Sequence, residues 1–168
     1  MNKLLVDLEA EENVLGSMME CPDCIGEVIG ILGENPKVFY KTAHQVIYNA
    51  IIEMTKEGEP VDCATVGSWL KRHAQDGVVG DLTYLYDLVA GVPTAANVSF
   101  YARCVKERAM RRRLVEIGRE IVRMAHDEEM EVDEAVDVAS QRLVKLLDGG
   151  AEDVPSLRSH LILSLIHI

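Results

Sequence analysis

The chain has 168 residues, of which 48% are hydrophobic, 27% charged and only 5% aromatic, and its formal net charge is −11. A chain of this length can bury one core without a disulfide or a metal, and its abundance of Leu, Ala, Glu and Met predicts an all-α protein. It contains no apolar run of the ~20 residues that a membrane span needs, and no signal-peptide pattern. We therefore expect a cytoplasmic protein with no membrane partner.

The first half of the sequence predicts several short helices packed as one bundle. Apolar residues recur at helical spacing over residues 7–19 and again from Ile25 towards Gly33, with Asp23 as the expected cap of the second helix. Thr42 is the expected N-cap of a third helix that ends at Gly58. A fourth follows Asp62 and is expected to continue towards the glycines at 77 and 80, and a fifth covers residues 82–89. We predict a globular helical bundle over residues 1–97.

The second half predicts two long helices joined by a short loop. Residues 96–126 contain no proline, and the acidic run at 127–129 separates them from a second helix that ends near residue 148. Both helices carry apolar residues at spacings of three, four and three, the pattern of a helix–helix seam. We predict an αα-hairpin over residues 98–148 whose uncovered apolar surface pairs with another protomer; the alternative is that it folds back on the bundle. The candidate interface residues are Leu114, Ile117, Ile121, Met124, Val136, Ala139, Leu143 and Leu146.

Motifs for catalysis are absent from the sequence. It has no Gly-Lys pair and so no phosphate-binding P-loop, no Gly-x-Ser-x-Gly elbow and no His-Glu-x-x-His pair. We predict no catalytic, cofactor-binding or metal-binding residues in this chain. His44 shares a helix side with Ile47 and Ile51 and is interpreted as a hydrogen-bonded core histidine.

Cys21-Pro22-Asp23-Cys24 is the one arrangement that could bind a metal or form a redox disulfide. A zinc site needs two further ligands, and the remaining cysteines, Cys63 and Cys104, each stand alone. We interpret the pair as inert reduced thiols.

Positive charge gathers in one segment of this acidic chain. Residues 103–123 hold 8 basic and 3 acidic side chains. Three readings of this helix are open: a solvated surface with internal ion pairs, contact with a neighbouring protomer or an acidic partner, or direct DNA binding. The candidate electrostatic contacts are Arg108, Arg111, Arg112 and Arg113.

Several spaced motifs together identify a family. They are Glu9-Ala10-Glu11-Glu12-x-Val14-Leu15-Gly16, Phe39-Tyr40-x-x-Ala43-His44, Gly58-x-Pro60-Val61-Asp62 and Pro93-Thr94-Ala95-Ala96-Asn97. From about residue 8 to 147 the chain resembles the N-terminal domain of DnaB-type replicative helicases.

The resemblance implies a function in DNA replication. Domains of this kind form a collar on a hexameric ring, in which paired hairpins make dimers, and they dock primase and, in some systems, a helicase loader. The resemblance also implies a longer parent protein, in which a linker leads to a RecA-like motor that uses ATP and Mg²⁺ to unwind DNA and move along single-stranded DNA. Residues 149–162 fit the start of that linker.

Residues 163–168 look like the translation of a synthetic sequencing-library end. We expect them to be a non-native tail that stands in place of the natural protein, which would continue past about Ile162. Two other functions fit the sequence alone: a separate helical module that binds or inhibits a replication protein, and a small DNA-binding regulator that uses the basic helix.

Overall fold

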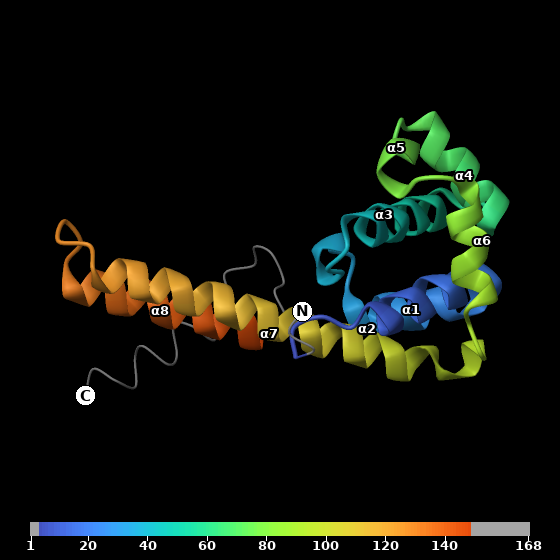
Figure 1. Ribbon diagram of the computed structural model, residues 1–168. Coiled ribbons are helices and arrows are strands. Elements are labelled where there is room, and N and C mark those ends of the chain that lie inside the picture. The colour runs from blue at the N-terminus through green and yellow to red at the C-terminus, as the bar shows by residue number, and fades with distance from the viewer. Residues whose placement is uncertain (1–3, 149–168) are drawn as a thin grey trace. The chain divides into compact units, whose positions relative to one another are not determined.

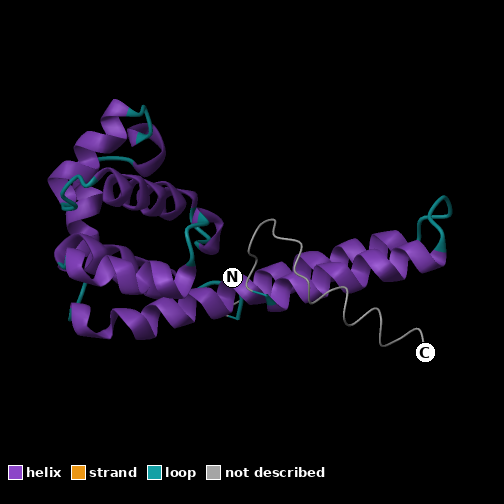
Figure 2. Cartoon of the chain, turned by 180° about the vertical axis from the view of Figure 1, so that it is seen from behind, coloured by secondary structure: helices purple, strands orange, loops and turns teal. Residues whose placement is uncertain are grey.

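The computed structural model describes residues 4–148, which contain helices and no strand (Figures 1 and 2). The all-α prediction is confirmed. The chain divides into two compact units, one through Arg112 and one from Arg113. The expected linker and the expected non-native tail lie outside the described residues.

The first unit is a bundle of six α-helices followed by the first part of a seventh. Short 3₁₀ turns, η1 to η3, lie between some of them. The bounds are α1 Leu8–Glu20, η1 Pro22–Cys24, α2 Ile25–Leu32, η2 Pro36–Val38, α3 Thr42–Glu57, α4 Cys63–Arg72, α5 Asp76–Val79, α6 Leu82–Ala90, η3 Ala95–Asn97 and α7 Val98–Ala125.

Side chains and glycine cap several helix ends, and the sequence predicts two of these ends, at Gly58 and Asp62. The side chain of Asp7 accepts a hydrogen bond from the Ala10 N–H at the start of α1, and Gly58 ends α3 in the left-handed conformation with φ of 71°. Asp62 and Thr65 form a reciprocal capping box at the start of α4. Each of these interactions is made within a few residues of chain.

Three of the predicted helix ends are wrong. Thr42 is the first residue of α3 and not its N-cap, which is Lys41 and makes no side-chain capping hydrogen bond. Asp23 does not cap α2, because Pro22 starts a 3₁₀ turn that places Cys24 at the N-cap position without a side-chain hydrogen bond. α4 ends at Arg72, short of the glycines, because Ala74 turns the chain with φ of 53°. The separate short helix α5 then follows.

One core joins the helices of the first unit. Its fully buried members include Leu15 and Met18 of α1, Ile47 and Ile51 of α3, and Leu85 of α6. The N-terminal part of α7 also belongs to this core through Val98, Ala102 and Val105, each at most 3% exposed. Burial of these apolar side chains is the main stabilising contribution to the bundle.

Close backbone approaches fix α6 against two other helices. A Cβ built on Gly16 of α1 would lie 2.3 Å from the carbonyl oxygen of Leu88, and one on Gly67 of α4 would lie 2.3 Å from a methyl group of Leu82. α6 therefore packs on α4 near its start and on α1 near its end. The contact at Gly16 requires a residue without a side chain because its neighbour is backbone, whereas at Gly67 the neighbour is the end of the Leu82 side chain, which can move.

The second unit contains the rest of α7 and α8 Val132–Leu147, which lie side by side (Figures 1 and 2). Glu120 of α7 and Arg142 of α8 form an ion pair, with Glu120 Oε2 lying 3.1 Å from Arg142 Nη1. The two groups are not aligned for a hydrogen bond. The turn between the helices spans residues 126–131. Within residues 4–148, no helix has the length and apolar character needed to cross a lipid bilayer.

Candidate functional site

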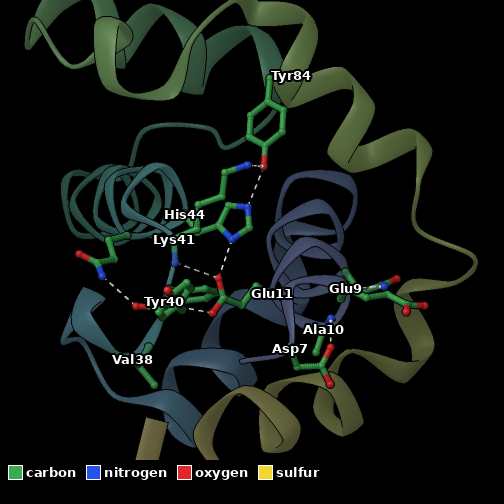
Figure 3. A network of polar contacts seen from close by, with 12 residues as sticks. Asp7, Glu9, Ala10, Glu11, Val38, Tyr40, Lys41, His44 and Tyr84 are labelled. Carbon is green, nitrogen blue, oxygen red and sulfur yellow. Dashed lines mark hydrogen bonds and ion pairs between the residues drawn. The ribbon is translucent and has the colours of Figure 1, made fainter. Parts of the chain in front are cut away.

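A buried polar network joins three helices of the first unit (Figure 3). Glu11 of α1 and His44 of α3 are 1% and 0% exposed, and Glu11 Oε2 lies 2.6 Å from His44 Nδ1. His44 Nε2 lies 2.7 Å from the hydroxyl of Tyr84 on α6, and Lys41 Nζ donates to the same hydroxyl at 2.7 Å. Glu11 also accepts the backbone N–H of Tyr40 at 2.6 Å.

The donors and acceptors in this network can be assigned self-consistently. Lys41 can only donate, so the Tyr84 oxygen accepts from Lys41, and the Tyr84 O–H is then able to donate to His44 Nε2. The other ring nitrogen, Nδ1, then carries the proton and donates to the Glu11 carboxylate. Both ring nitrogens of the buried imidazole have a partner, so His44 is the hydrogen-bonded core histidine that the sequence predicts.

This arrangement resembles a catalytic relay in composition but has a structural role. Glu11 and His44 are buried from solvent. The groups bonded at the two ends of the chain of contacts are the Lys41 ammonium and backbone amides, and none of them is a nucleophile placed for catalysis. Buried charged groups need such complete pairing to be tolerated. The network therefore fixes α1, α3 and α6 relative to one another.

Arg112 has a similar structural role at the end of the first unit. Its guanidinium donates to the carbonyl oxygens of Leu5 and Val38 at 2.9 and 2.7 Å and lies 5.7 Å from the ring centre of Tyr40. These contacts close two chain segments onto α7. The sequence placed Arg112 among the candidates for contact with a partner. In the structure its guanidinium N–H groups donate to backbone carbonyls of the first unit.

Of the other three candidate arginines, Arg111 and Arg113 lie on the surface among carboxylates, and Arg108 is half-buried. Arg111 pairs with Glu107 at 2.8 Å and Arg113 with Glu116 at 2.9 Å, and Arg108 approaches Glu107 at 3.7 Å. Exposed pairs of this kind contribute little to stability. The geometry agrees with a solvated helix that carries internal ion pairs.

The two cysteines of the Cys-Pro-Asp-Cys segment are half-buried free thiols. Burial, assisted by Cys21 and Glu27, raises the pKa of the Cys24 thiol to about 11, and its sulfur contacts the carbonyl oxygen of Ser17 at 3.6 Å. A raised pKa disfavours the thiolate that metal binding and redox chemistry require. Among residues 4–148, no group of three or more His, Cys, Asp or Glu side chains is arranged to hold a metal ion.

In the second unit, α7 and α8 contact each other through only part of the predicted seam. Ile117 is 1% exposed, and the side chains that share its helix side or face it from α8 are half-buried: Ile121, Met124, Ala139 and Leu146. Three other residues of the predicted interface are exposed: Leu114 at 51%, Val136 at 57% and Leu143 at 39%. The apolar surface of each helix is thus wider than the contact within the hairpin.

The uncovered residues form a second stripe on each helix. On α7 this stripe contains Val115, Gly118 and Val122, and on α8 it contains Val132, Val136, Leu143 and Leu147. Most of these directly follow a seam residue, as Gly118 follows Ile117 and Leu147 follows Leu146. Each stripe is therefore rotated about 100° from its seam, in the direction of rising residue number.

Equal rotations bring the two stripes together. When two antiparallel helices face each other, a rotation from the seam in the direction of the chain moves both stripes to the same side of the pair. The hairpin therefore presents one apolar face, called the hairpin face below, formed by both stripes. Its α7 members were not among the residues predicted from sequence, although Val115 and Val122 stand seven residues apart.

Comparison with known proteins shows which family the chain resembles in sequence. The profile of the DnaB-like helicase N terminal domain matches residues 3–107. The chain is 40% identical over 139 residues to the replicative DNA helicase DnaB of Mycobacterium leprae, and 37% identical over 139 residues to that of Geobacillus stearothermophilus. These matches cover 82% and 83% of this chain but only 23% and 30% of the relatives.

Solved structures show the same fold. The N-terminal domain of DnaB helicase from Mycobacterium tuberculosis superposes with a TM-score of 0.77 at 38% identity, covering 85% of this chain and 99% of that domain. A DnaB-like replicative helicase, solved in a study of its interactions with primase, superposes with a TM-score of 0.68; at 19% identity this likeness shows the fold alone. Family profile, relatives and fold agree, and the chain belongs to the DnaB-like helicase N-terminal domain family.

Proposed function

We propose that this chain is the self-association and partner-docking part of a replicative DNA helicase. The hairpin face is the observation that carries the proposal. Val132, Val136 and Leu147 are 74%, 57% and 81% exposed, and together with Val122 at 58% they form one side of a two-helix unit. Contiguous apolar surface of this kind is typical of protein interfaces, and two such faces pack as a four-helix bundle.

The partner in docking is a primase. A related helicase has been solved together with a study of its interactions with primase, and the chain matches 35% of that helicase. In a longer parent protein, ATP- and Mg²⁺-dependent unwinding and movement on single-stranded DNA would belong to a separate motor domain. A helicase loader is a further partner that the family resemblance implies.

Self-association is tested with an exposed residue of the hairpin face. Leu143→Asp should leave the helices intact and shift the oligomer to monomer, because pairing would bury an unpaired charge. Lys145→Asp, on the opposite side of α8, is the matched control. Light scattering after size-exclusion chromatography measures the mass, and a Leu143→Asp chain that associates like the control would contradict the proposal.

Ile117→Asp addresses the inner seam instead. Because Ile117 is 1% exposed, the aspartate should separate α7 from α8 and lower the helical signal in circular dichroism. Primase docking is tested separately by titrating a bacterial primase onto the immobilised wild-type chain. A primase that does not bind under conditions in which the chain self-associates would remove the docking part of the proposal alone.

A further inference from the structure

The N-terminal part of α7 carries an exposed row of residues on its outer side, called the outer stripe below: Phe100, Arg103, Lys106 and Met110. They stand three, three and four residues apart, so they lie within about 120° of one another around the helix and span ~15 Å along it. All four belong to the first unit, on the side of α7 away from the core residues Val98 and Ala102. This part of α7 runs along the edge of the bundle (Figures 1 and 2).

The outer stripe has an apolar side chain at each end. Phe100 is 59% exposed and Met110 is 41% exposed. The Phe100 ring lies edge-on to the ring of Tyr101, with the two ring centres 5.5 Å apart, and Tyr101 packs against the core of the first unit. Aromatic and methionine side chains are enriched in protein interfaces. The stripe therefore offers two apolar contacts that a partner could cover.

Two positive charges lie between these apolar ends. Within residues 4–148, neither Arg103 nor Lys106 forms an ion pair. Glu107 lies on the same side of α7, but its carboxylate pairs with Arg111 at 2.8 Å, so its charge is already offset. The sequence singled out other arginines of this basic helix, whereas the structure leaves Arg103 and Lys106 available for contact with an acidic group.

We propose that the outer stripe docks an acidic amphipathic helix of another protein, with two carboxylates at Arg103 and Lys106 and apolar side chains on Phe100 and Met110. Two helices that pack side by side share a rise of about 1.5 Å per residue. The partner helix would therefore carry two acidic residues three positions apart, with an apolar residue three or four positions to either side. The site lies on the first unit and does not depend on self-association through the hairpin face.

Charge complementarity favours a short acidic helix over a nucleic acid. Residues 1–102 hold 6 basic and 15 acidic side chains, so a phosphate backbone that extends beyond the stripe would meet mainly negative surface. Glu27 of α2 adds to this repulsion, because it accepts a hydrogen bond from Ser99 at the N-terminal end of the stripe. A short helix contacts the stripe alone, and its apolar residues match Phe100 and Met110.

A charge exchange between chain and peptide tests the proposal. The probe is a fluorescein-labelled synthetic helix of about 15 residues that carries two leucines ten positions apart and two glutamates between them at the proposed spacing. Fluorescence anisotropy measures its affinity for the full chain. The double variant Arg103→Glu, Lys106→Glu should bind it about tenfold more weakly, and a peptide with lysines in place of the glutamates should restore binding to that variant. Added salt should weaken both matched pairs.

Matched controls separate the stripe from charge and apolar surface in general. The double variant Lys37→Glu, Lys71→Glu changes the net charge equally at two exposed lysines outside α7, and it should bind the glutamate peptide like the wild type. Phe100→Ser should weaken binding severalfold, whereas Tyr86→Ser, at a 51% exposed aromatic residue of α6, should not. Circular dichroism confirms that each variant is folded.

The outcomes decide the proposal in either direction. Weaker binding by both stripe variants, with binding restored by the lysine peptide, supports it. A wild type that does not bind the glutamate peptide at up to ~1 mM, equal binding by the stripe and control variants, or a failed charge exchange would overturn it. A single-stranded oligonucleotide that binds the wild type more tightly than the peptide, and is lost in the Arg103→Glu, Lys106→Glu variant, would overturn it in favour of a nucleic-acid site. Each of these results leaves the proposed self-association to its own test at Leu143.

Discussion

Replacement of Glu11 by alanine should strongly destabilise the first unit. The side chain is 1% exposed, and its carboxylate accepts hydrogen bonds from His44 Nδ1 and from the Tyr40 amide, each at 2.6 Å. Removal leaves the buried imidazole N–H and the Tyr40 N–H without their acceptor, which costs about 1–3 kcal/mol each, or about 4 kcal/mol together. The Lys41 amide, 3.4 Å away, adds little.

Graded variants test the assigned hydrogen-bond directions. Glu11→Gln retains one acceptor oxygen but turns an NH₂ group towards one of the two donors, so we expect a loss of about 1–3 kcal/mol. Tyr84→Phe leaves His44 Nε2 without its donor while Lys41 can turn to solvent, and should cost about 1 kcal/mol. Glu9→Ala, an exposed residue of the same helix, is the control and should change little.

Urea unfolding followed by Trp69 fluorescence measures these losses. Trp69 is the only tryptophan of the chain and is 6% exposed in the core of the first unit, so its signal reports that unit specifically. A loss of about 4 kcal/mol corresponds to a fall in melting temperature of roughly 8–16 °C for a protein of this size. A Glu11→Ala chain within about 1 kcal/mol of the control would show that the network does not hold the helices together.

Three further predictions concern the bundle. Gly16→Ala should lower the free energy of unfolding by at least about 2 kcal/mol in the same urea assay, because its methyl group would meet the Leu88 carbonyl. Gly30→Ala, where nothing lies within 4 Å, should raise it by about 0.5–1 kcal/mol. Equal effects would refute the close approach. Asp62→Ala removes the capping box and should lower stability by about 1 kcal/mol, and Asp62→Asn should restore most of it. Cys24, with its pKa raised from 9.0 to about 11, should react with iodoacetamide at pH 8 about 100-fold more slowly than an ordinary thiol, and its rate should rise until about pH 11. Mass spectrometry of a chain with the other cysteines replaced by serine measures that rate, and a plateau near pH 9 would contradict the buried thiol.

Most of the helices and several of their ends follow from the sequence alone. Helical spacing of apolar residues requires only neighbouring turns, and the caps at Gly58 and Asp62 act within about four residues of chain. The failures have local causes that the pattern did not reveal, such as the left-handed turn at Ala74 that ends α4 early.

Contacts between residues far apart in the chain depend instead on tertiary packing. Glu11 and His44 are 33 residues apart and His44 and Tyr84 are 40 apart, so no local pattern could pair them. On the hairpin, periodicity marked apolar surface without separating the part that faces the other helix from the part left exposed. That division depends on the rotation of α7 and α8 about their own axes. The rotation is set by how the side chains of the two helices pack together, which the spacing of apolar residues along either helix does not determine.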